Sequence, residues 1–273
     1  MDFAYLSRVV RSIKECNNVH LHLDLIAGLP FEDYESFRKS FDDVFALRPH
    51  QLQLGFLKVL KGSPMEKRCV SYGLKHTELP PYEVMETNWI TYDDLIKLKS
   101  VEEMVEVYYN SGQFVNTIEL LIRDMESPFV FFEKLAQWYE TQGSEMLNFS
   151  RNQRYEMLLD FASGLENADP EKVKAAMTFD YYMRENAKNR PQFLGEENVS
   201  KAFSKEFYSR EARRHRFLKG GRLDTDDPRL LRKLTHIERY GDRYYLFDYS
   251  HRSPMDGNAR VVEIEDIEKG LSH

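Results

Sequence analysis

The segment from His20 to Pro30, with the sequence HLHLDLIAGLP, places ionisable side chains at every second position. Successive side chains of a β-strand point to opposite faces, so the leucines would share one face and the ionisable groups the other: His20, His22 and Asp24. Imidazole and carboxylate groups can move protons, bind metal or contact a polar substrate. The pattern predicts a strand with helices packed behind it and a polar cavity in front.

The chemistry of this polar face has several interpretations. A metal site would use the His20-x-His22 spacing, but it needs further ligands, and the other histidines lie in predicted turns, helices or tails. We favour histidines that line a polar lumen and bond to their neighbours, with direct substrate contact as the alternative. For Asp24 we favour a structural carboxylate over a general base, because no second carboxylate completes an acid/base pair. We assign no catalytic residue and no metal ligand.

Hydrophobic spacing predicts the elements around this strand. A helix is expected over 3–16, the strand over 20–27, a second helix that ends near residue 47, and a second strand over 51–56. This alternation with short connections is typical of parallel strands joined by a crossover helix.

The pattern changes after Pro80-Pro81. From residue 92 to about 216 the chain reads as a series of helices, and two short strands are expected over 244–249 and 259–263. We therefore expect an α/β domain over 1–90 and a mostly helical domain over 91–273 that ends in a small β-hairpin.

Composition limits the class of protein. The chain has 273 residues, a formal net charge of −7 and two cysteines, Cys16 and Cys69. Two thiols exclude a disulfide scaffold and a self-contained four-thiolate metal site. No apolar run approaches the roughly 20 residues that span a bilayer. We expect a soluble, reduced, cytoplasmic protein with no overall preference for nucleic acid or membrane.

The two predicted strands also carry a family resemblance. The pattern HLDLIAGLP over 22–30, a helix, and then LQLGFLKVLKGSPM over 52–65 resemble the later part of a radical S-adenosylmethionine (SAM) barrel. The subgroup is the one with a cobalamin-binding domain before the barrel, often labelled magnesium-protoporphyrin IX monomethyl ester cyclase or coproporphyrinogen oxidase-like. Weaker patterns over 80–84 and 179–182 resemble a C-terminal helical extension found in one branch of it.

The resemblance implies a fold and a set of site residues. The fold would be a partial radical SAM (TIM-like) barrel holding its fifth and sixth strands, followed by the helical extension. In that family the carboxyl ends of these strands help to hold the adenosine of SAM, which by position corresponds to Ile26, Ala27, Gly28, Leu57, Lys58 and Val59. The polar face of His20, His22 and Asp24 would line the substrate pocket.

Radical SAM enzymes bind an iron–sulfur cluster through Cys-x-x-x-Cys-x-x-Cys, and this sequence contains no such triplet. We therefore expect no cofactor retained by this chain alone and no radical chemistry from it. A parent enzyme would use SAM, a 4Fe–4S cluster and cobalamin. The implied partners are the N-terminal barrel and cobalamin domain of that parent and a small-molecule substrate, and open strand edges would favour self-association.

A second hypothesis is a stand-alone helical interaction or RNA-binding module. One basic cluster supports it, with aromatic residues among the cations: Arg210, Arg213, Arg214, His215, Arg216, Lys219 and Arg222. We favour a solvated helix face neutralised by the aspartates at 224, 226 and 227, as charge runs usually are.

Overall fold

The computed structural model describes residues 2–16, 18–143, 149–220 and 223–264. They form two compact units. The first comprises residues 1–112 and 121–148, and the second residues 113–120 and 149–273. The first unit thus contains the two predicted strands together with helices that lie beyond residue 90, where the sequence-based boundary was drawn.

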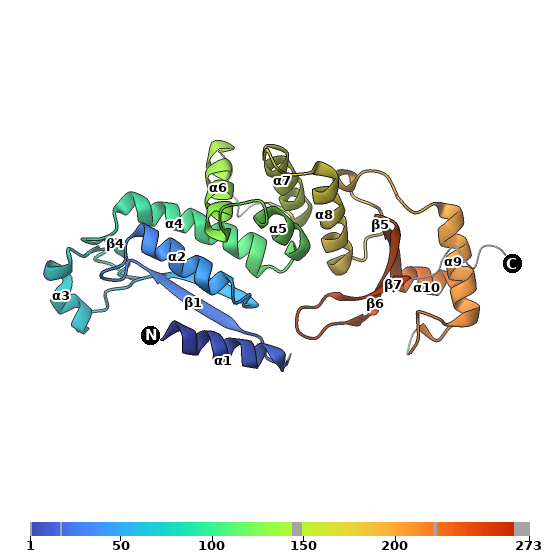
Figure 1. Ribbon diagram of the computed structural model, residues 1–273, viewed down its shortest axis with the longest axis horizontal. Coiled ribbons are helices and arrows are strands. Elements are labelled where there is room, and N and C mark those ends of the chain that lie inside the picture. The colour runs from blue at the N-terminus through green and yellow to red at the C-terminus, as the bar shows by residue number, and fades with distance from the viewer. Residues whose placement is uncertain (1, 17, 144–148, 221–222, 265–273) are drawn as a thin grey trace. The chain divides into compact units, whose positions relative to one another are not determined.

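The described residues of the first unit form two small sheets and a set of helices (Figure 1). Its helical segments are α1 (Phe3–Glu15), α2 (Tyr34–Phe45), α3 (Pro64–Tyr72), α4 (Tyr92–Val105), the π-helical turn η1 (Glu106–Asn110) and α6 (Pro128–Thr141). Its strands are β1 (His22–Ala27), β2 (Gln51–Phe56), β3 (Lys75–His76) and β4 (Val84–Glu86). The helix–strand–helix–strand order predicted for the first 56 residues is confirmed.

Strands β1 and β2 pair in parallel, as the sequence predicts. Their register runs from His22 opposite Gln51 to Ala27 opposite Phe56. The connecting helix α2 begins at a capping box. The Asp33 carboxylate accepts a hydrogen bond from the Ser36 backbone amide, and the Ser36 hydroxyl accepts one from the Asp33 backbone amide. This reciprocal cap fixes where the crossover helix starts and how it returns the chain to β2.

An aromatic core joins the crossover helix α2 to α6. Phe41 and Phe45 are fully buried and meet Phe132 with ring centroids 6.0 Å apart, and Phe41 also meets Phe129 edge-on at 5.4 Å. Each buried phenylalanine contributes roughly 2 to 3 kcal/mol of transfer free energy. Because this core lies behind the strands, it holds one face of the parallel pair in place and leaves the other free.

The outer edge of β2 is closed by a side chain. The Asn110 amide accepts from the Leu52 backbone N–H at 2.9 Å and donates to the Leu52 carbonyl at 3.0 Å, as a neighbouring strand would. The preceding residue, Tyr109, donates its hydroxyl to the Pro49 carbonyl. The π-helical turn η1 carries both residues, so its widened backbone directs them at the start of β2.

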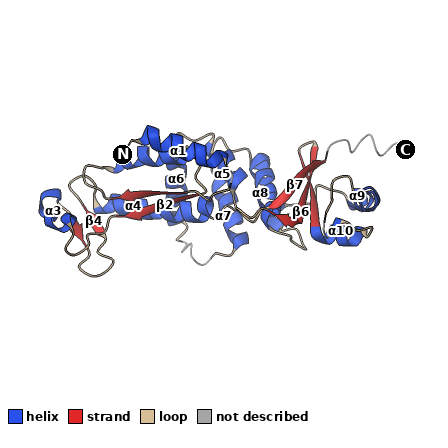
Figure 2. Ribbon diagram, turned by 90° about the horizontal axis from the view of Figure 1, so that it is seen from below, coloured by secondary structure: helices blue, strands red, loops and turns tan. Residues whose placement is uncertain are grey.

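The second unit combines helices with an antiparallel sheet of order β5–β6–β7 (Figure 2). Its helices are α7 (Arg151–Ser163), α8 (Pro170–Arg184), the short 3₁₀ turn η3 (Gln192–Leu194), α9 (Lys201–Arg214) and α10 (Pro228–Leu234). Its strands are β5 (Thr235–Tyr240), β6 (Arg243–Arg252) and β7 (Ala259–Ile264). Helix α5 (Val115–Ile122) starts in this unit and its last two residues fall in the first.

The predicted C-terminal hairpin is confirmed as β6 and β7, and the structure adds β5, which the sequence did not reveal. Strand β5 reads THIERY, so charged residues occupy positions that would have to be apolar in a simple alternating pattern. Glu238 is nevertheless buried. Its partners, described below, make that burial tolerable: Arg190 comes from outside the strand and His236 from β5 itself.

A buried carboxylate anchors α5 to α8. The two oxygens of Asp180 accept from the backbone amides of Asn116 and Thr117, from the Asn116 side chain and from the Thr117 hydroxyl, at 2.7–3.0 Å. Burial raises the pKa of Asp180 to about 6, while these hydrogen bonds act in the opposite direction. The carboxylate therefore satisfies amides at the start of α5 that the helix itself cannot.

We expect Asp180→Asn to lower the free energy of unfolding by about 2 kcal/mol at pH 8. The amide has one acceptor oxygen, so its NH₂ group must face a donor on Asn116 or Thr117. Denaturant titration measures the change. The exposed Asp160→Asn on α7 is the control, and an equal effect of both variants would contradict this role for Asp180.

Asn110→Asp should also destabilise the protein, by about 2 kcal/mol. A carboxylate cannot donate to the Leu52 carbonyl, and it would sit beside the Glu106 carboxylate, which now accepts from the Asn110 amide at 2.8 Å. Chemical denaturation compares this variant with Asn152→Asp, which makes the same replacement at an exposed site on α7. Indistinguishable midpoints would show that the edge of β2 does not depend on Asn110.

No described helix combines the length and the apolar character that crossing a membrane requires.

Candidate functional site

Strand β1 has the two-faced character that the sequence predicts. His22 and Asp24 are exposed, whereas Leu23 and Leu25 are half-buried on the opposite face, toward the helices. On β2, Leu52 and Leu54 continue the buried face. His20 precedes β1 and is also exposed. The exposed face of this parallel pair is the candidate site in the first unit.

Three imidazoles gather at the amino ends of β1 and β2. The His20 ring lies 4.8 Å from the rings of both His22 and His50. His50 was not singled out from the sequence, where it appeared in a turn. Its Nδ1 accepts the Leu21 backbone N–H at 3.0 Å, so the ring secures the approach to β1. This contact gives His50 a structural role.

These histidines are not joined by further ligands. Within the described ranges no group of three or more His, Cys, Asp or Glu residues is arranged to hold a metal ion. They also lie at the amino end of the strands, and six residues of strand separate His22 from Gly28, about 20 Å. Ligand sites in parallel α/β folds lie at the carboxyl ends, so the imidazoles stand far from that position.

The six residues that the resemblance assigns to SAM lie at or just after the carboxyl ends of β1 and β2. Ala27 and Val59 are each 1 % exposed and Gly28 is buried, whereas Ile26 and Lys58 are exposed. Gly28 has φ +85°, and a Cβ there would contact Val84, Leu57 and Leu95. Three of the six residues therefore hold the strand ends together, and the other three keep surface that a ligand could touch.

The chain itself covers one side of this end. The Val59 amide donates to the Tyr82 carbonyl and the Val84 amide donates to the Leu57 carbonyl, both at 2.8 Å. These bonds lie just beyond the end of β2, and the outer-edge backbone groups of Leu54 and Phe56, between them and Asn110, have no hydrogen-bond partner among the described residues. Both edge contacts of β2 are thus made within the first unit.

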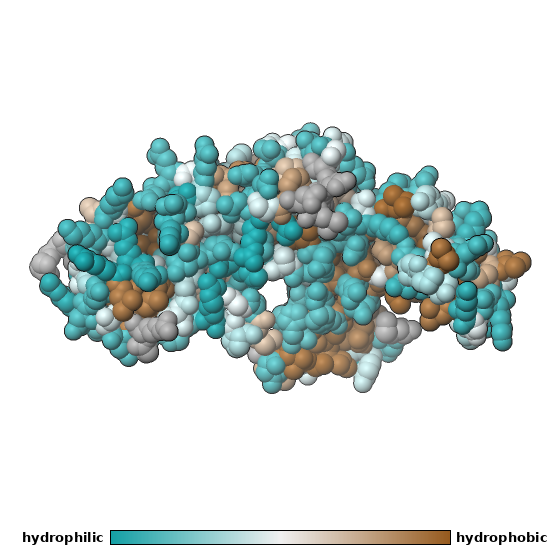
Figure 3. Space-filling model, turned by 180° about the vertical axis from the view of Figure 1, so that it is seen from behind, coloured by the Kyte–Doolittle hydropathy of each residue, from teal (hydrophilic) through white to brown (hydrophobic). Residues whose placement is uncertain are grey.

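Exposed aromatic and apolar side chains follow the turn after β1. Phe31 is 72 % exposed, has φ +70°, and meets Trp89 and Tyr72 at 4.5 and 5.6 Å. Val70, on α3, is almost fully exposed, and apolar surface is visible around α3 in Figure 3. A left-handed backbone is rare for phenylalanine and such conformations concentrate at functional positions.

The outer edge of β1 is open. The Gln51 amide donates to the Leu21 carbonyl and the Leu57 amide to the Ala27 carbonyl, so the odd-numbered residues of β1 face β2. The backbone groups of the even-numbered residues point to the other edge: His22, Asp24 and Ile26. No described residue forms a hydrogen bond with them.

Amide hydrogen-exchange rates should alternate from residue to residue along β1. We expect fast exchange of the His22, Asp24 and Ile26 amides and slow exchange of the Leu23 and Leu25 amides, because only the latter are bonded to β2. Residue-resolved NMR exchange at neutral pH measures both sets in one experiment. Uniform protection along β1 would mean that the edge is covered.

The basic cluster that favoured RNA binding spans the end of α9 and the segment that follows it. Arg210 lies 3.5 Å from the Glu206 carboxylate and His215 lies 3.5 Å from that of Asp226. Arg216 lies over the Phe217 ring at 4.9 Å. Arg222 lies outside the described residues. Part of this cluster is thus neutralised by its own neighbours, in line with the solvated-face interpretation.

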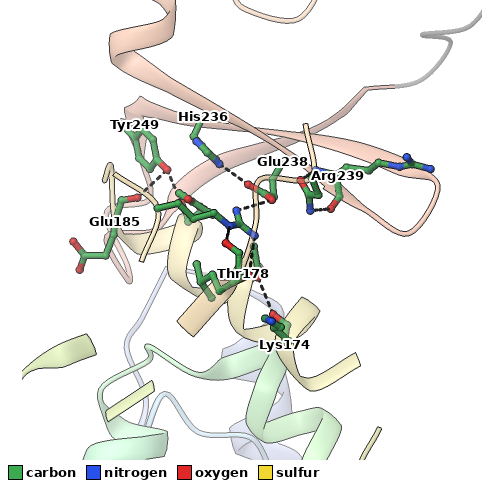
Figure 4. Close-up of polar contacts among 12 residues, drawn as sticks. Lys174, Thr178, Glu185, His236, Glu238, Arg239 and Tyr249 are labelled. Carbon is green, nitrogen blue, oxygen red and sulfur yellow. Dashed lines mark hydrogen bonds and ion pairs between the residues drawn. The ribbon is translucent and has the colours of Figure 1, made fainter. Parts of the chain in front are cut away.

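The second unit contains a polar assembly that the sequence did not indicate. Arg190 forms a buried ion pair with Glu238 at 2.8 Å, and the other Glu238 oxygen contacts His236 Nε2 at 2.7 Å (Figure 4). The His236 ring stacks on Tyr182 at 3.6 Å. Burial raises the pKa of Tyr182 to about 12. Arg190 and His236 are 46 positions apart in the chain, so no local sequence pattern could predict that they meet.

This assembly forms one side of a cavity of about 330 Å³. The cavity lies between β5, the first turns of α9, the end of α10 and the segment 186–190. Five basic and two acidic residues line it, although the whole chain carries a net charge of −7. All lining residues belong to the second unit.

A family model described as "Protein of unknown function (DUF4080)" matches residues 70–254. The match includes α4, η1 and all residues of the cavity, and it begins after the carboxyl end of β2. A comparison with curated proteins gives no match.

Proposed function

The chain belongs to the DUF4080 family, and from this premise we propose that it supplies the last strands and the C-terminal extension of a radical SAM enzyme of the cobalamin-dependent type. In this proposal β1 and β2 are two strands of a TIM-like barrel. The chain would close that barrel and shape its SAM and substrate pocket. The iron–sulfur cluster and the cobalamin would be bound by other parts of the enzyme.

The observation that carries the proposal is a parallel sheet of two strands with one bare face and one open edge. Parallel sheets in proteins almost always have both faces covered, and an open edge of a strand is a site for further pairing. The helices cover one face. On the outer edge of β2, Asn110 bonds Leu52 and the segment 82–84 bonds Leu57 and Val59, whereas the outer edge of β1 has no hydrogen-bond partner among the described residues, and an earlier barrel strand would pair there.

The open face also has room for a ligand near its carboxyl end. Gly55 lies beside Ile26, and a Cβ built on Gly55 would contact only the Leu25 carbonyl oxygen, at 3.6 Å. A flat adenosine group fits a surface of this kind, with Ile26 and Lys58 at its margins. When bound, SAM would supply a carbon-centred radical after reductive cleavage. This chain's residues would position it and exclude water.

In this proposal the residues on the polar face of β1 have different roles according to their position along the strand. Asp24 lies between the two ends and could contact a bound substrate. His22 lies about 20 Å from Gly28 and His20 farther still, and the His20 ring stacks on His50, so we assign both histidines to the closed end of the barrel. The substrate-pocket role expected for both histidines stays a prediction.

The test is to express the chain together with the sequence encoded upstream of its Met1 codon. We expect that sequence to contain Cys-x-x-x-Cys-x-x-Cys, and the joined protein to bind SAM and release 5′-deoxyadenosine after reduction with dithionite. Gly55→Val should weaken SAM binding about tenfold or more without loss of stability, because the position is open. Gly164→Val, at the end of α7, is the matched control.

An upstream sequence without the cysteine triplet, or a joined protein that binds no SAM, would contradict the proposal. Equal affinity of the Gly55→Val protein and wild type would contradict only the ligand position. Isothermal calorimetry with SAM gives the affinities, and circular dichroism confirms that both variants fold.

A further inference from the structure

The cavity of the second unit carries cations without counterions. Four exposed cations line it, Lys188, Lys201, Arg232 and Lys233, and none of them forms an ion pair within 4.0 Å with a described residue, although Glu197 also lines the cavity. The fifth cation, Arg190, is already paired with Glu238. Four unpaired cations around one cavity repel one another, and a bound anion would relieve that repulsion.

We propose that this cavity is a binding site for a small organic phosphate. The proposal rests on residues of the second unit alone and does not depend on the barrel.

An unpartnered hydroxyl lines the cavity beside the cations. Ser204 is 8 % exposed as a residue, and its hydroxyl forms no hydrogen bond with any described residue. Because a hydroxyl both donates and accepts, a ligand oxygen in the cavity could take the place that water otherwise fills. Ser204 lies in the first turns of α9, a helix of 14 residues whose amino end favours negative charge.

The floor of the cavity is already ordered. Arg190 donates to Glu238, to the Gly195 carbonyl at 3.0 Å and to the Leu194 carbonyl at 3.3 Å. These bonds tie the turn η3 to β5, and the stacked rings of His236 and Tyr182 fill the space beside them. A fixed floor lowers the entropy lost when a ligand binds.

Charge and size indicate the ligand class. A phosphomonoester carries nearly two negative charges at neutral pH and three acceptor oxygens, which suits several cations around one hydroxyl. The cavity, at about 330 Å³, is at the small end of ligand pockets. Apolar surface from Val199 and Ile237 can contact the carbon part of such a molecule.

Calorimetry on the full chain with ribose 5-phosphate, and with inorganic phosphate, tests the site. We expect ribose 5-phosphate to bind more tightly than phosphate. The double variant Arg232→Gln/Lys233→Gln should weaken it about tenfold or more, and Ser204→Ala about fivefold. The control Lys205→Gln/Arg229→Gln removes two exposed charges from the same two helices outside the cavity and should leave the affinity unchanged. Thermal unfolding confirms that each variant folds.

The proposal is overturned if neither probe binds at about 10 mM, or if the control pair weakens binding as much as the cavity pair. Equal affinity for succinate would overturn the phosphate assignment in favour of a general dianion site. Binding of a single-stranded RNA in the absence of ribose 5-phosphate binding would instead support the RNA hypothesis. None of these outcomes bears on SAM, which is tested on a joined protein and at Gly55.

Discussion

Every strand at the edge of a sheet leaves backbone amides and carbonyls that must find partners. The β1–β2 sheet and the β5–β6–β7 sheet have two and three strands, so edge strands make up most of each sheet. The protein closes two of them with asparagine. Asn110 bonds both backbone groups of Leu52 on β2, and Asn198 bonds both backbone groups of Arg239 on β5, at 3.1 and 2.6 Å. The same device is used once in each unit.

The two asparagines also bear on the proposed sites. Asn198 also lines the cavity, so the residue that ends the sheet contributes to a wall of the proposed phosphate site. In the first unit, Asn110 bonds one residue of the β2 edge, and the outer edge of β1 has no hydrogen-bond partner among the described residues. The outer strand β7 carries exposed Arg260 and Glu263, and charges on an edge strand discourage pairing.

The sequence predicted those parts of the fold that depend on local periodicity. The alternation along 22–25 and the stripe of Phe37, Phe41 and Phe45 follow directly from the geometry of a strand and a helix, and both are present. Strand β5 was missed because its buried Glu238 depends on Arg190, 48 positions earlier. Neither asparagine closure could be predicted, since an amide side chain that imitates a strand has no signature until the edge it faces is known.

The two sites differ in how much of each this chain provides. The cavity is built from residues 182–238, which lie wholly inside the family match at 70–254. At its floor, Arg190 forms hydrogen bonds with residues of the same unit. Strands β1 and β2 precede that match, and their polar face is exposed. The family match thus covers the extension, with the residues of the cavity, and does not cover β1 or β2. Because the residues of the proposed phosphate site all lie in the extension, its ligand would bind whether or not β1 and β2 pair with further strands, so the proposed ligand binding and the proposed closure of a barrel would be separable properties of one chain.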